Sequence, residues 1–357
     1  MRIFYDHQIL TYQKVGGVSR YFCEIMKRMP KNQWFTSTLI SNNQYVDEYD
    51  LFKHYHFLPD YNFKFKSRLM LEMGIPLTLY HLCKKDFDIY HQTHFEPFSL
   101  LGLGNKPMVT TFHDMNFFTC NKNSCLMKSQ LKSLQRADAI IAISNNTKND
   151  LIEQLHIDEN KIKVIYHGIY KYPRLCKNRI IEQQYILYVG NRYNKFKNFK
   201  NLIKAFAILK GKYNDIYLVC VGQQFTKDEI KTFIEYHIDN NIKCIYANDS
   251  QLNRLYHDAL FFIYPSIYEG FGFPILEAMV NGCPVALANA SCFPEIAQDA
   301  AIYFSPYNID DIYNTMDTLI SSESQRNELK IKGNERVKAF SWEKSVNQHL
   351  KIYESLL

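Results

Sequence analysis

Short apolar runs rich in β-branched and aromatic residues alternate with longer helical patterns along the chain, and the alternation occurs twice. Parallel strands need long crossover connections, which helices usually supply, so this alternation is typical of parallel sheets covered by helices. The first series of expected strands spans 2–5, 35–40, 88–91, 108–112, 139–144 and 163–166. The second series spans 185–190, 216–222, 243–247, 260–265, 284–289 and 301–305. The sequence therefore predicts an α/β fold with two domains, each built on a parallel sheet.

The break between the two series sets the expected domain boundaries. A length of 357 residues is about twice that of a usual single domain. The stretch around Pro173 has no clear periodicity, which indicates a linker. We predict a first domain at 1–170, a linker at 171–184 and a second domain at 185–338. The remaining residues, 339–357, are expected to form an amphipathic helix that packs back on the first domain.

Composition argues against several classes of protein. The nine cysteines are odd in number and scattered, and the chain opens on the strand-like RIFYD rather than on a signal peptide. Both observations favour a protein of the reducing cytoplasm. Apolar runs stay well below the roughly 18 residues that a membrane-spanning helix needs. The one close cysteine pair, Cys120 and Cys125, lacks two further ligands at matching spacing, so we expect ordinary thiols rather than a zinc site.

Basic residues are concentrated in the first half of the chain. Residues 1–175 hold 22 Lys and Arg against 16 Asp and Glu, a difference of +6, whereas the remainder is balanced at 20 against 20. The densest part interleaves apolar side chains with Lys53, His54, His56, Lys64, Lys66, Arg68, Lys84 and Lys85. This mixture suits either a solvated helix face or docking on the inner face of an anionic membrane, where each basic residue contributes about 1 kcal/mol. Nucleic acid is not an expected partner, because no nucleic-acid-binding motif accompanies the charge.

Ligands of open parallel sheets bind at the carboxyl ends of the strands, so function is sought in the loops that follow strands. After the first strand, Gly16 and Gly17 open a helix. Adjacent glycines let a backbone approach a ligand and helix-start N–H groups favour an anion, although an ordinary turn uses the same residues. His113 follows the strand MVTTF and is placed to hydrogen-bond a substrate, although a structural histidine is the common alternative. His91 and His94 are expected in a polar loop that faces the substrate.

The second half carries two cations in the loop YVGNRYNKFKN. Arg192 and Lys197 stand just beyond a strand and before a helical pattern. Such a pair suits a diphosphate, since arginine binds phosphate oxygens bidentately and lysine supplies a point charge. Two exposed surface charges explain the same residues equally well.

The stretch YEGFGFPILEAMVNGCP holds two glutamates eight positions apart, Glu269 and Glu277. Pro274 fits the first turn of a helix, where its missing N–H is not needed, and Gly282 followed by proline ends that helix. Glu269 is therefore expected in the preceding loop and Glu277 in about the first helical turn, where a carboxylate is stabilising even without a function. Backbone N–H groups between them can point at oxygen atoms of a ligand. They belong to Gly270, Phe271, Gly272 and Phe273.

Taken together, these motifs resemble the family 4 glycosyltransferases, retaining enzymes of the GT-B fold. YEGFGFPILEAMVNGCPV is similar to the family's segment with two glutamates, YVGNRYNKFKN to its diphosphate loop and TFHD to its acceptor-side histidine motif. IIAISNNTKNDL, VIYHGI, SCFPEIAQDAAIYFSP and FSWEKSVNQHLKIYESLL also match, so the likeness covers nearly the whole chain. The resemblance implies two Rossmann-like domains whose parallel sheets face each other across a cleft. DHQILTYQKVGGVSRYF is similar to bacterial members that add mannose or rhamnose to O-antigen and other surface polysaccharides.

The resemblance also implies a role for each matched residue. Glu277 would accept hydrogen bonds from the ribose hydroxyls of a nucleotide, and Arg192 and Lys197 would neutralise the diphosphate leaving group. Glu269 would face the donor sugar, and His113 would lie near the sugar carbon under attack. N–H donors to the sugar and the diphosphate would come from Gly17, Phe271, Gly272 and Phe273. Such pre-placed cations and donors would stabilise the negative charge that grows as the glycosidic bond breaks.

The implied reaction is transfer of a hexose, mannose or rhamnose-like, from a nucleotide-diphosphate sugar to a growing, lipid-linked surface glycan, with GDP-mannose as the expected donor. No metal is required, and no acidic pair at a strand end has the spacing to hold one. Retention fits a covalent intermediate or a same-face route, and the second is favoured because no carboxylate is an evident nucleophile. A glycoside hydrolase would have no use for a diphosphate loop. A non-catalytic sugar-nucleotide binder would share the fold, but here the named positions carry chemically competent residues.

Overall fold

The computed structural model forms two compact units. Unit 1 contains Met1–Gly168 and Ser341–Leu357, and unit 2 contains Ile169–Phe340. The structure describes residues 1–115, 125–169 and 176–357. Cys120 and the linker residue Pro173 lie outside the described residues.

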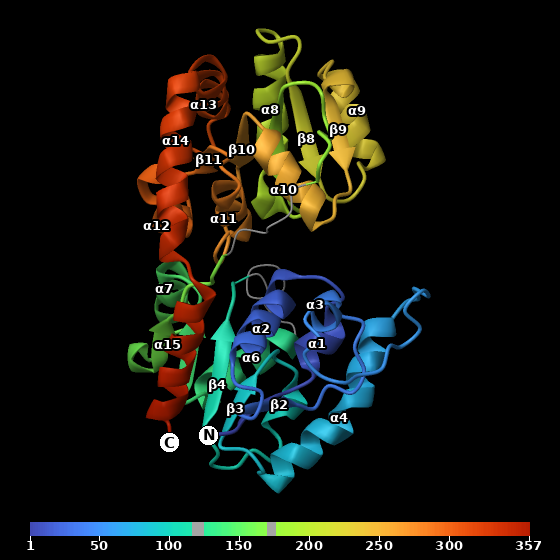
Figure 1. Cartoon of the computed structure of the whole chain (residues 1–357), viewed down its shortest axis with the longest axis vertical. Coiled ribbons are helices and arrows are strands. Elements are labelled where there is room, and N and C mark those ends of the chain that lie inside the picture. Colours follow the sequence, from blue (N-terminus) through green and yellow to red (C-terminus); the bar gives the residue numbers. More distant parts are fainter. Residues whose placement is uncertain (116–124, 170–175) are drawn as a thin grey trace. The chain divides into compact units, whose positions relative to one another are not determined.

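Unit 1 is built on a six-stranded sheet with the order β2-β1-β3-β4-β5-β6. Its strands β2, β3 and β4 are labelled in Figure 1. Its strands are β1 (Ile3–Tyr5), β2 (Trp34–Thr36), β3 (Ile89–Gln92), β4 (Met108–Phe112), β5 (Ala139–Ala142) and β6 (Ile162–Val164). All its pairings are parallel, as predicted. The helices are α1 (Gln8–Tyr12), α2 (Gly17–Arg28), α3 (Gln44–Glu48), α4 (Lys66–Lys84), α6 (Cys125–Arg136), α7 (Asn145–Glu153) and α15 (Trp342–Ser355). The central strands are buried throughout, which is usual for parallel sheets with helices on both faces.

The strand predicted at 35–40 is wrong at its carboxyl end, because β2 ends at Thr36. The hydroxyl groups of Thr36 and Thr38 are 2.7 Å apart, and the Thr38 N–H donates to Thr36 Oγ1 at 3.2 Å. Short polar side chains of this kind offer the backbone an alternative to the strand ladder. Farther along, Ile40 forms only an isolated bridge with Tyr55. The early exit from the sheet opens a long connection that carries α3 and leads to α4.

Helix α15 joins unit 1 through a buried polar network. The hydroxyl of Tyr353 lies 2.7 Å from Nδ1 of His91 on β3 and 3.0 Å from the hydroxyl of Tyr5 on β1. Nε2 of His349, one turn earlier in α15, lies 2.6 Å from the hydroxyl of Tyr21 on α2. These side chains are all buried. A buried polar group without a partner costs about 1–3 kcal/mol, so the network specifies where α15 packs.

The predicted substrate-facing loop at His91 and His94 is wrong for His91. This residue lies inside β3 and is fully buried. Its Nε2 is 3.0 Å from Oγ1 of Thr111 on the neighbouring strand β4, so both of its ring nitrogens are used within unit 1. His94 does follow the strand, where its ring stacks on Tyr12 at a centroid distance of 5.6 Å.

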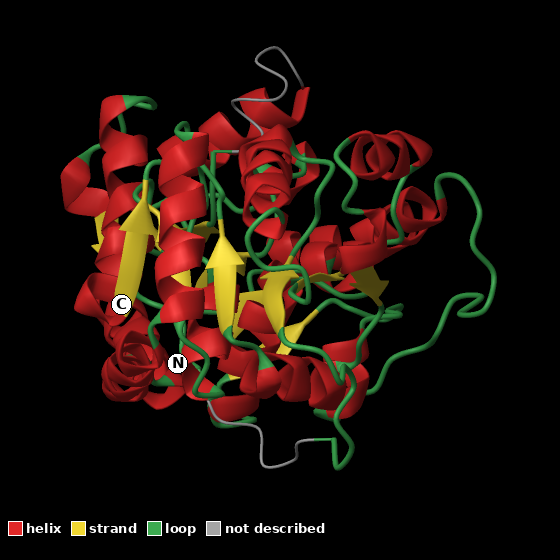
Figure 2. Ribbon diagram, turned by 90° about the horizontal axis from the view of Figure 1, so that it is seen from above, coloured by secondary structure: helices red, strands yellow, loops and turns green. Residues whose placement is uncertain are grey.

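Unit 2 repeats the architecture with a second six-stranded parallel sheet, in the order β12-β11-β10-β7-β8-β9. Its strands are β7 (Tyr185–Val189), β8 (Tyr217–Val221), β9 (Ile242–Ile245), β10 (Phe261–Tyr264), β11 (Val285–Ala288) and β12 (Ala301–Phe304). Each lies within or beside one of the predicted runs. The helices are α8 (Phe199–Lys210), α9 (Lys227–Glu235), α10 (Asp249–Asp258), α11 (Phe273–Val280), α12 (Phe293–Ala297), α13 (Ile309–Ser321) and α14 (Glu323–Arg336). Figure 2 shows strands flanked by helices. Within the described ranges, no helix has the length and apolar character needed to cross a membrane.

Each sheet reverses its strand order beside its first strand. In unit 1, β1 lies between β2 and β3, and in unit 2, β7 lies between β8 and β10. At such a reversal the loops after two neighbouring strands lead to opposite faces of the sheet. The space that this leaves at the carboxyl edge is where open α/β sheets bind their ligands.

Unit 1 also holds six histidines whose pKa values are lowered by burial. The pKa falls to about 3 for His113 and to about 4 for His94 and His349. The pKa of His7 lies below the ordinary value for histidine, and the pKa values of His91 and His167 lie well below it. These imidazoles are therefore neutral in the folded protein near neutral pH.

We expect the stability of unit 1 to decrease as the pH falls below about 6.5, the ordinary pKa of histidine. The unfolded chain then binds protons that the folded state excludes, and each such histidine lowers the free energy of unfolding by about 1.4 kcal/mol per pH unit until its folded pKa is reached. Both tryptophans, Trp34 and Trp342, belong to unit 1, so urea unfolding followed by tryptophan fluorescence reports on this unit. Burial raises the pKa of Asp6, which acts in the opposite sense but is a single group. Equal stability at pH 7.5 and 5.5 would contradict the prediction.

Candidate functional site

Unit 2 brings Lys197 and Glu269 into contact at its strand-order reversal. Lys197 ends the short helix η3 (Lys195–Lys197) after β7, and Glu269 lies in the loop after β10. Nζ of Lys197 is 2.5 Å from Oε1 of Glu269, and the two side chains are 18% and 17% exposed. Tyr264, the last residue of β10, donates its hydroxyl to Glu269 Oε1 at 2.7 Å and accepts from Lys197 at 2.9 Å. Two predicted residues from separate motifs therefore share one site.

The chemistry of this cluster suits an anionic ligand. Burial, followed by the nearby Glu269 carboxylate, raises the pKa of Tyr264 well above its ordinary value, so its hydroxyl stays protonated and donates. An ammonium group has three N–H donors, and the contacts with Glu269 and Tyr264 use two of them. Lys197 is thus held in a fixed position by groups that do not exhaust its capacity to donate.

Ser291 fixes the backbone of Glu269. Its Oγ accepts from the Glu269 N–H at 3.2 Å and donates to the Glu269 carbonyl oxygen at 2.6 Å. Ser291 has a φ of 53°, which non-glycine residues adopt infrequently and at some cost in strain. It follows β11, the strand next to β10, so a neighbouring strand end sets the direction in which Glu269 points.

The residues between the two glutamates form a turn anchored in the core. Gly272 has a φ of 85°, and a Cβ at this position would lie 2.9 Å from Cδ1 of Ile275, so only glycine fits. Phe271 is buried, with its ring 5.6 Å from Phe273 and 6.0 Å from Phe340 between centroids. Gly270 is buried as well. The aromatic side chains hold the turn, while its backbone leads into the start of α11.

Helix α11 begins at Phe273 with Pro274 in its first turn, as predicted. The placement of Glu277 in about the first turn is corrected, because no acidic residue lies in that turn. The helix starts one residue before the proline, so Glu277 falls beyond it and the stabilising effect of the helix N-terminus is a weaker explanation for its presence. Tyr256 on α10 donates to Oε2 of Glu277 at 3.4 Å.

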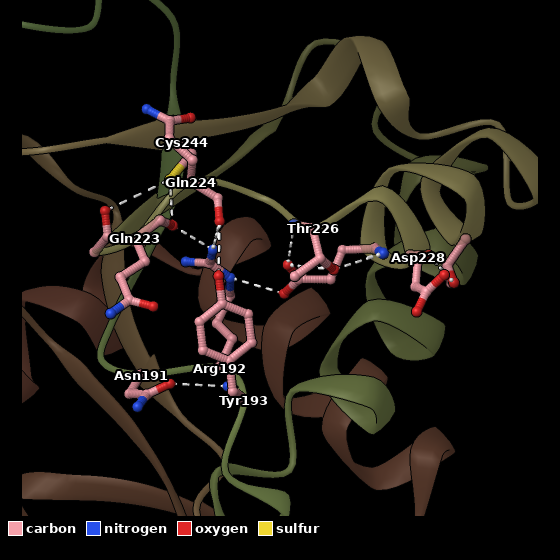
Figure 3. Close-up of polar contacts among 11 residues, drawn as sticks. Asn191, Arg192, Tyr193, Gln223, Gln224, Thr226, Asp228 and Cys244 are labelled. Atoms are coloured by element: carbon pink, nitrogen blue, oxygen red, sulfur yellow. Dashed lines mark hydrogen bonds and ion pairs between the residues drawn. The ribbon is translucent and has the colours of Figure 1, made fainter. Parts of the chain in front are cut away.

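Arg192 lies deeper than expected for a phosphate-binding side chain. Its side chain is 1% exposed, and Nε is 2.9 Å from Oε1 of Glu229. Nη2 donates to the carbonyl oxygens of Gln223 and Gln224, the second at 3.1 Å (Figure 3). The guanidinium also lies 4.7 Å from the ring centroid of Phe225. Nη1 is buried and has no hydrogen-bond partner among the described residues.

These contacts make Arg192 an organiser of the loop between β8 and α9. Its partner Glu229 also accepts from the backbone N–H of Thr226 at 2.8 Å, closing a capping box at the start of α9. A cavity of about 530 Å³ opens beside Arg192 between α8 and α9. Neither Lys197 nor Glu269 is among its lining residues, so it is separate from their cluster.

His113 directly follows β4 in unit 1, as predicted. Its ring is edge-on to Tyr21 at a centroid distance of 5.1 Å and stacked on His167 at 6.1 Å. Burial, followed by His94, lowers the pKa of His113 to about 3, so the imidazole is neutral near pH 7. Nε2 is buried and has no hydrogen-bond partner in the described parts of the chain. A neutral ring of this kind can hydrogen-bond a substrate hydroxyl.

The glycine pair opens α2 as predicted, with Gly16 before the helix and Gly17 as its first residue. A Cβ on Gly16 would lie 2.4 Å from Oε1 of Gln13. That oxygen accepts from the Ser19 N–H at 3.1 Å, so the start of α2 is partly satisfied within unit 1. A side chain at position 16 would have to displace the Gln13 amide from the start of α2, whereas Gly17 is exposed.

Three residues that shape the site in unit 2 are absent from the predicted set: Tyr264, Ser291 and Glu229. The spacing of Thr226 and Glu229 in TKDE is a recognisable capping box, but its link to Arg192 is not visible in the sequence. Tyr264 could be suspected as the last residue of a strand. Ser291 offers no sequence signal.

Two family models match this chain. The model described as Glycosyltransferase Family 4 matches residues 15–170, and the one described as Glycosyl transferases group 1 matches residues 177–336. The O-antigen chain mannosyltransferase B of Escherichia coli is 31% identical over 292 residues, which cover 76% of this chain and 75% of that protein. The O-antigen chain mannosyltransferase RfbU of Salmonella typhimurium is 27% identical over 175 residues, which cover 49% of this chain and 48% of that protein.

Solved structures give the same fold. The glycosyltransferase from Rickettsia africae has a TM-score of 0.74 and 22% identity, covering 99% of this chain and 98% of its own. Anabaena HepE in complex with UDP has a TM-score of 0.78 and 17% identity, covering 99% of both chains.

The two parallel-sheet units thus have the GT-B architecture of glycosyltransferases. The chain belongs to the family 4 glycosyltransferases, and it is a glycosyltransferase enzyme.

Substituting Arg192 by Gln is expected to destabilise unit 2 by about 3 kcal/mol, because it leaves the Glu229 carboxylate without its partner in a nearly buried ion pair. Far-UV circular dichroism during urea unfolding measures the change, while tryptophan fluorescence, which reports on unit 1, should stay unchanged. The control is Lys212→Gln, which breaks the exposed pair with Asp317 and should cost at most about 1 kcal/mol. Wild-type stability combined with weaker binding of a nucleoside diphosphate would instead make Arg192 a ligand-binding residue.

Proposed function

We propose that this glycosyltransferase moves mannose, with retention of configuration, from a nucleotide-diphosphate sugar to a growing O-antigen-type glycan on a lipid carrier. Support for the sugar and the glycan comes from two sequence relatives that are O-antigen chain mannosyltransferases. Support for the nucleotide comes from HepE, which was solved in complex with UDP. The observation that carries the donor site is the cluster of Lys197, Glu269 and Tyr264 at the strand-order reversal of unit 2.

In this proposal Lys197 stabilises the leaving diphosphate. Negative charge grows on the phosphate oxygens as the glycosidic bond breaks, and a cation that is already held in place needs no reorganisation to meet it. The contacts with Glu269 and Tyr264 hold the ammonium in that way. Lys197 and the backbone N–H groups of residues 270–273 are proposed to supply the charge stabilisation, and transfer would then need no metal ion.

The two glutamates are proposed to contact different parts of the donor. Glu269, held by Ser291 and beside Lys197, is proposed to face the sugar. Glu277 lies on the neighbouring helix α11 and is proposed to accept hydrogen bonds from the ribose hydroxyls. The hydroxyl of Tyr256 lies 3.4 Å from Oε2 of Glu277, a long hydrogen bond that a ribose hydroxyl would replace.

We propose a same-face reaction. The bond between the anomeric carbon and the phosphate oxygen breaks, the acceptor hydroxyl oxygen forms the new bond on the same face, and its proton passes to the departing phosphate. In unit 1, neutral His113 is proposed to orient a sugar hydroxyl through its buried Nε2. Its pKa of about 3 makes it a hydrogen-bonding group rather than a charged one near neutral pH.

Glu277→Ala is expected to weaken binding of GDP-mannose, whereas Glu269→Ala is expected mainly to lower turnover. Loss of a charged hydrogen-bond partner of the ribose costs about 1.5–3 kcal/mol, or roughly tenfold to a hundredfold in affinity. Isothermal titration calorimetry measures donor binding, and mass spectrometry of a lipid-linked acceptor measures transfer. Equal donor affinity in Glu277→Ala and the wild type would contradict the ribose assignment.

A panel of GDP-, UDP- and dTDP-sugars with the wild-type protein tests the sugar and the nucleotide. Mannose transfer from GDP-mannose supports the proposal, and transfer of another sugar overturns the mannose assignment. For the Glu277→Ala and Glu269→Ala variants, the control is Glu295→Ala, which removes a carboxylate from α12 of the same unit. Binding of several donors without transfer or slow hydrolysis would indicate a non-catalytic sugar-nucleotide binder.

We also propose that the connection before α4 contacts an anionic membrane. Tyr55, Tyr61 and Phe65 are 75%, 69% and 69% exposed, and the loop that carries them extends outward from unit 1 (Figure 1). Nζ of Lys64 lies 5.0 Å from the ring centroid of Phe65, so a cation and an aromatic ring are presented together. Exposed aromatic and basic side chains are the combination that binds the headgroup region of anionic bilayers.

The structure narrows the set of side chains available for this contact. Met70 and Leu71 are buried in unit 1. Nζ of Lys66 donates to the carbonyl oxygens of Leu58 and Tyr61, at 2.6 and 2.8 Å. Arg68 pairs with Glu72 and Glu96. Lys64 and the exposed aromatic residues are therefore the ones to test.

Lys64→Gln is expected to weaken binding to phosphatidylglycerol vesicles about fivefold, the equivalent of about 1 kcal/mol for one basic residue near the surface. Flotation with these vesicles, compared with neutral phosphatidylcholine vesicles, measures the effect. Arg68→Gln should change binding less, because its guanidinium is already paired. Equal flotation of the wild type with both kinds of vesicle, or of Lys64→Gln and the wild type, would rule out this electrostatic contact.

A further inference from the structure

Two histidines and an aspartate converge on one point of the connection between β2 and α4. Asp47 belongs to α3, and His54 and His56 follow it in the chain. Oδ1 of Asp47 is 2.9 Å from Nε2 of His54 and 3.5 Å from Nε2 of His56. The three ligand atoms all lie within 4.8 Å of one another, and this is the one such group of three within the described residues. None of these residues has a part in the proposed transfer.

The hydrogen bonding of His54 leaves a mismatch at this point. Its Nδ1 lies 3.1 Å from the carbonyl oxygen of Phe52, and its Nε2 faces the carboxylate of Asp47. Both partners are acceptors, whereas a neutral imidazole has a single N–H to donate. If Nδ1–H donates to Phe52, the lone pair of Nε2 points at a carboxylate oxygen. In the other neutral tautomer, Nε2–H donates to Asp47 and the lone pair of Nδ1 faces the carbonyl oxygen of Phe52 instead. A proton or a metal cation between Nε2 and the carboxylate satisfies both contacts.

The geometry points to a divalent transition-metal site, and we propose that Zn²⁺ binds to Asp47, His54 and His56. Ligand atoms about 2.0–2.1 Å from a tetrahedral zinc ion lie roughly 3.3 Å apart, which the distances of 2.9 and 3.5 Å bracket. Imidazole nitrogens suit zinc and its neighbours, whereas Mg²⁺ and Ca²⁺ prefer oxygen ligands. The fourth position would hold water. The bond from Nδ1 of His54 to a backbone carbonyl is the outer contact that typically orients a metal-binding histidine.

The surrounding chain holds the ligands in place before any metal arrives. Asn43 caps α3 by accepting from the N–H groups of Tyr45 and Val46, which fixes the helix that carries Asp47. Asn42 pairs with both backbone groups of Phe57, at 2.8 and 3.1 Å, just beyond His56. Hydrogen bonds thus hold the chain near Asp47 and near His56, and a bound ion would link α3 to the loop after it. The proposed role is structural and is separate from the transfer reaction.

The alternative is a charged His54 that forms an ion pair with Asp47. A second histidine–aspartate pair serves as a comparison: Nδ1 of His257 is 2.9 Å from Oδ1 of Asp258, which also pairs with Arg254, and no third metal ligand joins them in the described set. An ion pair needs only two groups, so this alternative predicts that Zn²⁺ affects the Asp47–His54 pair no more than the Asp258–His257 pair. A metal site predicts that His56 matters as much as His54.

Titration of Zn²⁺ into the full chain, with a phosphine reductant that keeps the cysteines reduced, tests the proposal by calorimetry. The wild type and the control His257→Gln should bind one equivalent with the same affinity. Asp47→Asn and His56→Gln should each weaken that binding tenfold or more, since even outer contacts of a metal site are worth about tenfold to a hundredfold. His56 and Asp47 are exposed, so these variants should fold.

A second readout tests whether the zinc lies at this place. Phe52 packs edge-on against Trp34 at a centroid distance of 6.4 Å and against His54 at 5.8 Å, so Trp34 is close enough to report on the site. Zn²⁺ should raise the unfolding temperature followed by tryptophan fluorescence in the wild type and in His257→Gln, but not in His56→Gln. Equal zinc affinity in all four proteins, or no binding to the wild type, would overturn the proposal.

Discussion

Because the strands are parallel, each connection must return from the carboxyl end of one strand to the amino end of the next. In both sheets the direction in which strands are added reverses beside the first strand. The two reversals create equivalent positions at the carboxyl edges, but the chain uses them differently. In unit 1, the position beside β1 is filled by Asp6, which accepts from Gln8 Nε2 at 2.9 Å and also from Tyr90 and Thr93. Burial raises the pKa of this carboxyl group. The reversal of unit 1 is therefore closed by internal hydrogen bonds.

In unit 2, the same topological position holds charged groups that remain partly exposed. Two ion pairs follow β7 and differ in their exposure to solvent: Arg192 with Glu229 and Lys197 with Glu269. Arg192 is 1% exposed, and its guanidinium contacts Glu229 and loop carbonyl oxygens. Lys197 is 18% exposed, and its ammonium group contacts Glu269 and Tyr264. Arg192 therefore holds a loop, while Lys197 keeps the access to solvent that its proposed contact with a ligand requires.

The return of the chain to unit 1 depends on a close approach of two segments. A Cβ on Gly168 would lie 2.2 Å from the backbone nitrogen of Trp342, so glycine is needed where the outgoing and returning segments pass. Beyond that point α15 supplies His349 and Tyr353 to the polar network under the sheet. The last helix is thus part of the interior of unit 1, although the whole of unit 2 separates it in sequence from its partners.

The sequence by itself determined the two parallel sheets, the approximate position of each described strand apart from the carboxyl end of β2, the glycine start of α2 and the proline start of α11, because these follow from local periodicity and from the backbone limits of glycine and proline. It also singled out Lys197, Glu269 and His113 from their places after strands. Only the tertiary structure decided that Arg192 turns inward to Glu229, that His91 is a core residue and that Tyr264 and Ser291 support Glu269. It alone brought Asp47 to His54 and His56. The physical reason is that these outcomes depend on which strand ends and loops become neighbours, and local sequence patterns do not encode those distances.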